Sequence, residues 1–236
     1  MKKLGVIGGM GPAATAIFYE MLIEKTPAEK DQQHIPMVIL NDCLMPDRTA
    51  AILGTDEDRE TIFARLLSDA LYLKQGGCDA LAVPCNTSHF FADRLEKESG
   101  IKLLNMPRLT AQAALKKCGK GAKVAVLATD GTVNTGVYQK ALSEQGLEAW
   151  NPPEDIQKLV MYMIYDKVKA GADYGFSDWK PVEDSVSAAG CSCAVLGCTE
   201  LSVFRSYHSL PPFYVDAMEV LAELSVVLCG KQLCNI

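Results

Sequence analysis

The segment Leu4-Gly5-Val6-Ile7-Gly8-Gly9-Met10-Gly11-Pro12 opens the chain with an apolar run, a cluster of glycines and a proline. The apolar run is typical of a short buried strand, and Pro12 suits the first turn of a helix that we expect to extend to Met21. A strand, a glycine turn and a helix in this order indicate the start of an α/β unit with parallel strands.

The second half of the chain repeats this plan. The apolar run from Val124 to Thr129 leads into a turn at Gly131 and predicts a helix through Leu142. Further along each half, an apolar strand runs into a cysteine, Cys85 in the first half and Cys198 in the second. In each half the strand–turn–helix segment comes first and the strand that ends at a cysteine comes second. The offset between the two halves is nearly the same for both kinds of segment. We therefore predict an internal duplication.

The intervening segments complete the predicted topology. A strand is expected over 36–40, and helices over 56–75 and 154–170. The last strand, 213–216, and the helix after it are expected to return to the first domain. The prediction is thus α/β: two similar Rossmann-like parallel-sheet domains, 1–104 plus 212–236 and 105–211, related by pseudo-two-fold symmetry with a site in the cleft between them.

Composition excludes several classes of protein. The chain has 236 residues, 49% of them hydrophobic, and a net charge of -6, so a phosphate-coating surface and a nucleic-acid partner are not expected. Glycines interrupt the first apolar run, and the longest uncharged run, 185–199, falls short of the ~20 apolar residues that a membrane span needs. We expect no export, no membrane partner and a cytoplasmic location.

The nine cysteines do not form a recognisable framework. There is no C-x-x-C pair and no histidine at the spacing of a zinc site, so a structural metal is not expected. An odd number of cysteines in a chain of this size fits reduced thiols better than disulfides. Most of them are expected to be small buried hydrophobic residues.

Cys85 and Cys198 are the candidates for chemistry. Both follow predicted strands, and ligands of parallel sheets bind beyond the carboxyl ends of the strands. Two thiols facing each other could invert a carbon with an acidic hydrogen, one removing a proton while the other delivers one to the opposite face. Each cysteine also precedes a predicted helix, whose N–H groups and dipole should lower the thiol pKa. Asn86, Thr87 and Thr199 add donors for a substrate carboxylate.

Six segments together resemble the aspartate/glutamate racemase family. They occur in family order across nearly the whole chain: Gly8-Gly9-Met10-Gly11-Pro12, Pro46-Asp47-Arg48-Thr49, Pro84-Cys85-Asn86-Thr87, Ala128-Thr129-Asp130-Gly131-Thr132, Val168-Lys169-Ala170-Gly171 and Gly197-Cys198-Thr199-Glu200. The resemblance implies racemisation of aspartate or glutamate in both directions, without pyridoxal phosphate, metal or nucleotide, usually by a homodimer.

The resemblance also implies roles for individual residues. Cys85 and Cys198 would be the acid/base pair, and Arg48 and Lys169 would contact the substrate. The implied substrate-binding set is Met10, Arg48, Asn86, Thr87, Thr129, Thr132, Lys169, Thr199 and Glu200. Two departures from the family pattern are Ser88, where many relatives carry Ala, and Cys43, just before the Arg48 loop. Neither removes a catalytic group.

Each candidate has a plain structural alternative. The two cysteines could be buried packing residues, Arg48 a surface charge and Glu200 an ordinary acid of a first helical turn. Lys169 could complement a helix dipole, and Lys167 is its rival for substrate contact. Thr129 and Thr132 could cap a helix. His89 lies one helical turn after Cys85, but a Cys–His nucleophile pair is not favoured.

Other functions compete with racemisation. Residues 9–14 fit the G-x-G-x-x-A pattern of an NAD(P)-dependent dehydrogenase, but Pro12 is unusual there and Asp42 comes later than the ~20 residues expected for a ribose-binding acid. A single-thiol decarboxylase and a non-catalytic amino-acid-binding protein are argued against by the second cysteine. Cell-wall glutamate racemases typically carry His where Glu200 stands. The sequence leaves open the substrate, the thiol that is ionised at rest and the oligomeric state.

Overall fold

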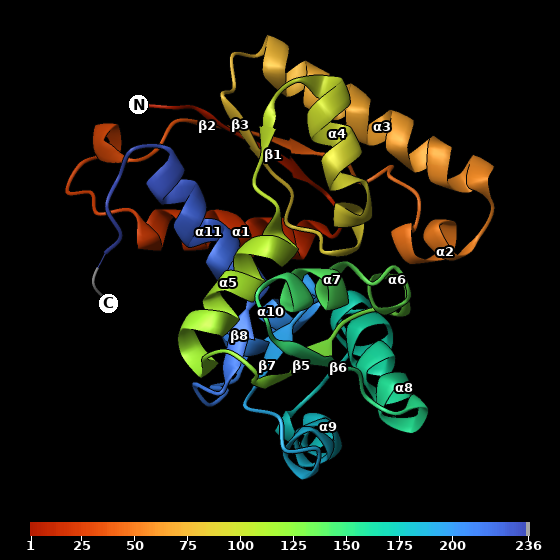
Figure 1. The fold of residues 1–236 in the computed structure, drawn as a ribbon. Coiled ribbons are helices and arrows are strands. Elements are labelled where there is room, and N and C mark those ends of the chain that lie inside the picture. The colour runs from red at the N-terminus through yellow and green to blue at the C-terminus, as the bar shows by residue number, and fades with distance from the viewer. Residues whose placement is uncertain (235–236) are drawn as a thin grey trace. The chain divides into compact units, whose positions relative to one another are not determined.

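The computed structural model describes residues 1–234, which divide into two compact units (Figure 1). The first unit comprises residues 1–106 and the chain from Met218 onward, and the second comprises Pro107–Ala217. Each unit contains one four-stranded parallel sheet surrounded by helices. The predicted α/β class and the two parallel-sheet domains are confirmed.

The sheet of the first unit has the strand order β2-β1-β3-β4. Its strands are β1 (Leu4–Gly8), β2 (Met37–Asn41), β3 (Ala80–Ala82) and β4 (Lys102–Leu103). Its helical segments are α1 (Pro12–Lys25), η1 (Asp31–Gln33), α2 (Arg48–Leu53), α3 (Asp56–Gln75), η2 (Thr87–Phe91), α4 (Ala92–Ser99) and α11 (Ala217–Leu228). In Figure 1, α3 and α4 lie on one side of this sheet and α1 and α11 on the other.

The sheet of the second unit has the equivalent order, β6-β5-β7-β8. Its strands are β5 (Lys123–Leu127), β6 (Glu148–Trp150), β7 (Cys193–Leu196) and β8 (Tyr214–Asp216). Its helical segments are α5 (Met106–Cys118), α6 (Asp130–Asn134), α7 (Val137–Glu144), α8 (Glu154–Tyr162), the π-helix η3 (Met163–Lys169), α9 (Phe176–Ala188) and α10 (Thr199–Tyr207). The equal strand orders agree with the predicted duplication of the topology.

One boundary prediction is wrong. Residues 212–216 were expected to return to the first domain, but β8 pairs in parallel with β7, with Ala194 opposite Tyr214. Trp179 also donates a hydrogen bond to the Tyr214 hydroxyl at 3.1 Å, within the core of the second unit. The strand is therefore bound to the second sheet by both backbone and side-chain contacts, and only the chain from Met218 onward belongs to the first unit.

Two predicted helices are interrupted. The helix expected through Leu142 is divided into α6 and α7 because Gly136 adopts a φ of +68°, which cannot continue a right-handed helix. The helix expected over 154–170 begins as α8 and continues as the wider turns of η3. Cys85 precedes the 3₁₀-helix η2 rather than an α-helix, which starts only at Ala92.

The first strand forms the centre of the first core. Leu4, Val6 and Ile7 are fully buried, and the apolar face of α3 packs over the sheet through side chains such as Ile62 and Leu66. Burial of this kind contributes about 25 cal/mol for each Å² of apolar surface removed from water. The apolar run that opens the sequence thus forms a buried inner strand of the sheet. The loop of Met10 follows directly from the end of this strand.

Gly9 allows two loops at the carboxyl ends of β1 and β2 to meet. Its φ is +88°, and a Cβ at this position would lie 2.4 Å from the carbonyl carbon of Asp42. Only glycine fits both the backbone conformation and the close approach. The glycine turn therefore holds the loop of Met10 against the end of β2.

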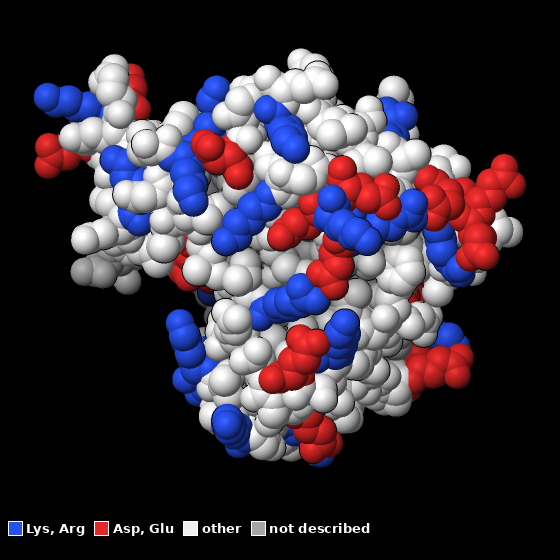
Figure 2. Space-filling model, turned by 45° about the horizontal axis from the view of Figure 1, so that its top comes forward, with Lys and Arg blue, Asp and Glu red and all other residues white. Residues whose placement is uncertain are grey.

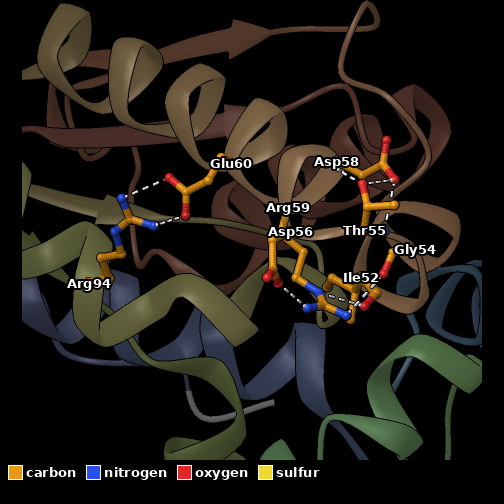
Figure 3. Close-up of polar contacts among 8 residues, drawn as sticks. All are labelled: Ile52, Gly54, Thr55, Asp56, Asp58, Arg59, Glu60 and Arg94. Carbon is orange, nitrogen blue, oxygen red and sulfur yellow. Dashed lines mark hydrogen bonds and ion pairs between the residues drawn. The ribbon is translucent and has the colours of Figure 1, made fainter.

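Polar contacts fix the segment that joins α2, α3 and α4 (Figure 3). Thr55 and Asp58 form a capping box at the start of α3. Arg59 donates to the carbonyl oxygens of Ile52 and Gly54, which closes the turn between α2 and α3. Arg94 of α4 makes a two-point ion pair with Glu60 of α3. These contacts position the helices that carry Arg48 and follow Ser88.

The surface carries charges of both signs. On the face drawn in Figure 2, Lys and Arg side chains are interspersed with Asp and Glu side chains. Within residues 1–234, no helix combines the length and apolar character needed to span a membrane.

Candidate active site

Cys85 and Cys198 occupy equivalent places in the two units. Cys85 follows β3, which pairs with β1, and Cys198 follows β7, which pairs with β5. Both thiols are buried and both are reduced. The carboxyl end of a parallel strand is the expected place for a ligand-binding group, so each unit contributes one candidate site.

The Cys85 thiol lies beside a hydroxyl and a thioether. The Ser88 hydroxyl is 3.2 Å from Cys85 Sγ and 3.4 Å from Met10 Sδ, and all three side chains are buried. Ser88 reaches the thiol because η2 places the third residue after Cys85 back over it. The Cys85 thiol therefore has a hydroxyl donor within hydrogen-bonding distance.

His89 does not pair with the Cys85 thiol. Its ring nitrogens face two backbone carbonyl oxygens, those of Cys85 at 2.9 Å and Leu104 at 3.3 Å. Burial lowers the pKa of this imidazole, although the two carbonyl oxygens oppose the shift. His89 therefore ties the Cys85 loop to the chain after β4, as expected for a structural residue.

Arg48 joins two loops of the first unit. It is the first residue of α2, and its guanidinium donates to the carbonyl oxygens of Met10 at 3.2 Å, Pro46 at 2.9 Å and Met45 at 3.3 Å. Asp47 caps the same helix through a hydrogen bond from the Ala50 N–H. The structure thus connects Arg48 with the loop of Met10, and its contact with substrate stays a prediction.

Cys198 lies in a charged environment. Its thiol donates to Glu200 Oε2 at 2.9 Å, and the other carboxylate oxygen, Oε1, is 2.8 Å from Lys169 Nζ. Thr199 donates to the same Oε2 at 3.4 Å. Glu200 is only 4% exposed, so it is not an ordinary solvated acid of a first helical turn. Cys198 and Glu200 are buried, and with the partly exposed Lys169 they form a thiol–carboxylate–ammonium series.

The pKa of the Cys198 thiol is raised well above its ordinary value, contrary to the expected lowering by a helix N-terminus. Burial is the largest cause, and the Glu200 carboxylate adds to it by repelling a thiolate. The Lys169 ammonium and a hydrogen bond from the Glu200 backbone oppose the shift without overcoming it. Cys198, which precedes α10, is therefore held as a neutral thiol.

The structure distinguishes the two rival lysines. Lys169, at the end of η3, pairs with Glu200, whereas Lys167 donates to the carbonyl oxygen of Asp173. The Lys169 ammonium also lies 5.4 Å from the centre of the Tyr165 ring. Lys169 is thus the lysine that belongs to the Cys198 site.

Of the remaining predicted residues, Thr129 and Thr132 follow β5, while Asn86, Thr87 and Thr199 follow the two cysteines directly. Thr129 caps α6 by accepting from the Thr132 N–H, and the two hydroxyls are 3.1 Å apart. Asn86 and Thr87 are buried directly after Cys85. Gly197 lets the strand end pack closely, since a Cβ there would lie 3.0 Å from Ala128 Cβ. The capping alternative for Thr129 is confirmed, and carboxylate binding by these residues stays a prediction.

Comparison with known proteins agrees with this arrangement. The sequence profile of the Asp/Glu/Hydantoin racemase family matches residues 7–224. The chain belongs to this family. Within residues 1–234, no three side chains of His, Cys, Asp or Glu are grouped to hold a metal ion.

Several racemases are similar to this family member over nearly its whole length. The aspartate racemase of Picrophilus torridus is 31% identical, with a TM-score of 0.76 over 99% of this chain and 96% of that one. The broad specificity amino-acid racemase RacX of Bacillus subtilis is 22% identical over 94% of this chain and 96% of its own length. The glutamate racemase of Aquifex pyrophilus, 23% identical with a TM-score of 0.61 over 97% of this chain and 84% of that one, shares the fold.

Sequence reasoning missed two contacts within this racemase-family chain. Ser88 was noted only as a departure from the family pattern, and its contact with Cys85 Sγ was not predicted. Its spacing of three residues from Cys85 is the signal that could have indicated it, given a 3₁₀ turn. The pairing of Glu200 with Lys169 joins residues far apart in the sequence, and no local pattern indicates it.

Proposed function

We propose that the protein racemises an acidic amino acid, aspartate or glutamate, by proton transfer at Cα between Cys85 and Cys198, without pyridoxal phosphate or metal. The observation that carries this proposal is the buried thiol at the carboxyl end of equivalent strands in two units of equal topology. Membership of the racemase family supports the reaction class. The aspartate racemase of Picrophilus torridus supports the substrate class.

The mechanism requires the two thiols to face opposite sides of the substrate α-carbon. One cysteine, as the thiolate, removes the α-proton, and the other, as the thiol, delivers a proton to the opposite face. After one turnover the first cysteine holds the proton and the second is the thiolate, so the opposite enantiomer reacts with the roles reversed. Each proton transfer by a positioned group contributes about 10²- to 10⁴-fold in rate.

In this proposal Glu200 and Lys169 control the protonation of Cys198. The carboxylate accepts the thiol hydrogen bond at 2.9 Å and could take the proton when Cys198 must act as the base. Lys169, 2.8 Å from the same carboxylate, offsets the negative charge of the pair. Arg48 and Lys169 would also favour a substrate with a side-chain carboxylate, since positive charges in a site matter more than the net charge of -6.

The decisive experiment is incubation of each enantiomer of aspartate and glutamate with the protein in deuterated water, without added cofactor. We expect loss of optical purity together with deuteration at Cα. Cys85→Ala and Cys198→Ala should each abolish racemisation, while Cys43→Ala, which removes an exposed thiol, should not. Full racemisation by both active-site variants would exclude the two-thiol mechanism.

A broader substrate range is the second candidate, favoured by the likeness to RacX. The same assay with neutral and basic amino acids separates the two. Racemisation of those substrates at rates similar to aspartate and glutamate would replace acidic-substrate selection by broad specificity. The homodimer and the cytoplasmic location stay predictions, and sedimentation of the purified protein tests the former.

A further inference from the structure

The two candidate thiols have opposite hydrogen-bonding environments. The Cys198 thiol donates a hydrogen bond to a carboxylate, Glu200 Oε2, at 2.9 Å. Cys85 instead lies 3.2 Å from the Ser88 hydroxyl, which can donate to the sulfur. A carboxylate acceptor stabilises a neutral thiol, whereas a hydroxyl donor stabilises a thiolate. The mechanism described above assigns no role to this hydroxyl.

Ser88 has two sulfur acceptors within reach but only one proton to donate. Its oxygen is 3.2 Å from Cys85 Sγ and 3.4 Å from Met10 Sδ. A neutral thiol and a thioether are both weak acceptors, so neither holds the hydroxyl strongly. A thiolate is a charged acceptor, and hydrogen bonds to charged groups are roughly twice as strong. Ionisation of Cys85 would therefore draw the Ser88 hydroxyl toward it.

Burial strengthens this effect. Ser88 is 3% exposed and Cys85 5% exposed, so water supplies little alternative stabilisation to a thiolate at this place. A hydrogen bond acts more strongly in such a low-dielectric environment than in water. His89 does not compete for the sulfur, because its ring contacts the backbone oxygens of Cys85 and Leu104. The Ser88 hydroxyl is thus a side-chain donor at hydrogen-bonding distance from the Cys85 sulfur.

We propose that Ser88 is a positioning residue that stabilises the thiolate of Cys85 and makes Cys85, rather than Cys198, the thiol that ionises first. The resting protein would then hold Cys85 as the base and Cys198 as the acid. This assignment of roles rests on the proposed two-thiol racemisation, but the hydrogen bond from Ser88 to Cys85 can be tested without substrate.

The experiment follows thiolate formation by ultraviolet absorbance as the pH is raised. Subtracting the titration of Cys85→Ala from that of the wild type isolates the Cys85 signal, and Cys198→Ala does the same for Cys198. The same subtraction is made in the Ser88→Ala background. We expect Cys85 to titrate before Cys198 in the wild type, and its midpoint to rise by about one pH unit in Ser88→Ala. The Cys198 midpoint should not move.

Ser225→Ala is the matched control. Ser225 is a fully buried serine of the same unit whose hydroxyl donates to the carbonyl oxygen of Leu221 at 2.7 Å, without contact to Cys85. Its substitution should leave the Cys85 midpoint unchanged. An unchanged midpoint in Ser88→Ala, an equal rise in Ser225→Ala, or earlier titration of Cys198 in the wild type would each overturn the proposal.

Met10→Leu provides a second variant in case Ser88→Ala does not fold. Leucine has a similar volume but lacks the thioether that competes for the Ser88 proton. We expect the Cys85 midpoint to fall by a few tenths of a pH unit, because the Ser88 hydroxyl then has no competing thioether acceptor to leave when Cys85 ionises. A rise in the midpoint would contradict the proposal. Failure of the deuteration assay together with these titration results would reject racemisation while leaving the Ser88–Cys85 hydrogen bond supported.

Discussion

Lys169 Nζ lies 2.8 Å from one oxygen of the Glu200 carboxylate, and the Cys198 thiol donates to the other oxygen at 2.9 Å. The carboxylate therefore links a cation to the candidate acid/base residue of the second unit. Since Glu200 is 4% exposed, a change to Lys169 should alter the electrostatic environment of Cys198, and a change to Cys198 that of Lys169.

Glu200→Gln should lower the pKa of the Cys198 thiol. The carboxylate raises that pKa by repulsion and by accepting the thiol proton, and the amide removes both effects while Lys169 remains. We expect an earlier titration of Cys198 and a racemisation rate about 100-fold lower, because the acceptor for its proton is lost. Glu154→Gln, which breaks the exposed pair with Lys158, is the control. An unchanged Cys198 titration would contradict this role of Glu200.

Lys169→Met should have the opposite effect on Cys198. The ammonium lowers the thiol pKa, so its removal should raise the pKa further and leave Glu200 with an uncompensated charge. We expect at least a 100-fold loss of racemisation and a loss of about 1–3 kcal/mol in unfolding free energy, measured in urea. Lys167→Met should change the rate by less than about twofold. Equal losses of racemisation in the two variants would show that Lys169 contributes no more to the reaction than Lys167.

Asp69→Asn should stabilise the protein at alkaline pH. One carboxylate oxygen of Asp69 is buried without a hydrogen-bond partner in residues 1–234, and burial, with a contribution from Asp42, raises its pKa to about 6. Stability from a raised carboxyl pKa is present below the unfolded value of 3.8 and is lost as the pH rises through 6. The variant should gain about 1–2 kcal/mol over the wild type at pH 8 and less at pH 5.

Urea unfolding at the two pH values measures this difference. Asp56→Asn, on the same helix but exposed, is the control, and its effect should be equal at pH 5 and pH 8. A gain for Asp69→Asn that does not depend on pH would indicate that the carboxyl does not titrate in this range.

Gly9→Ala should be far more destabilising than Gly77→Ala. Both glycines have positive φ, +88° and +77°, so both substitutions introduce backbone strain of about 1–2 kcal/mol. Only at Gly9 would the new Cβ lie 2.4 Å from the Asp42 backbone; at Gly77 the nearest atom is the Lys3 ammonium at 3.6 Å. We expect an additional loss of about 1–3 kcal/mol for Gly9→Ala. Similar unfolding free energies for the two variants would rule out the close approach of the two loops.

The duplicated topology was predictable because its signals are local. An apolar run, a glycine turn and a helix start all lie within a few neighbouring residues, as in the segment from Leu4 to Pro12, and the second half repeats them. The placement of β8 was not predictable in the same way. Tyr214 pairs with Ala194, twenty residues earlier, and a strand's choice of sheet depends on such non-local pairing.

The candidate site shows the same division between local sequence signals and non-local contacts. The sequence by itself determined which residues end equivalent strands, and so singled out Cys85 and Cys198, because strand order and apolar pattern are encoded locally. Only the tertiary structure decided how each thiol is surrounded. Glu200 raises the pKa of Cys198, Lys169 lowers it, and Ser88 donates toward Cys85. These effects depend on distance and burial rather than on residue type.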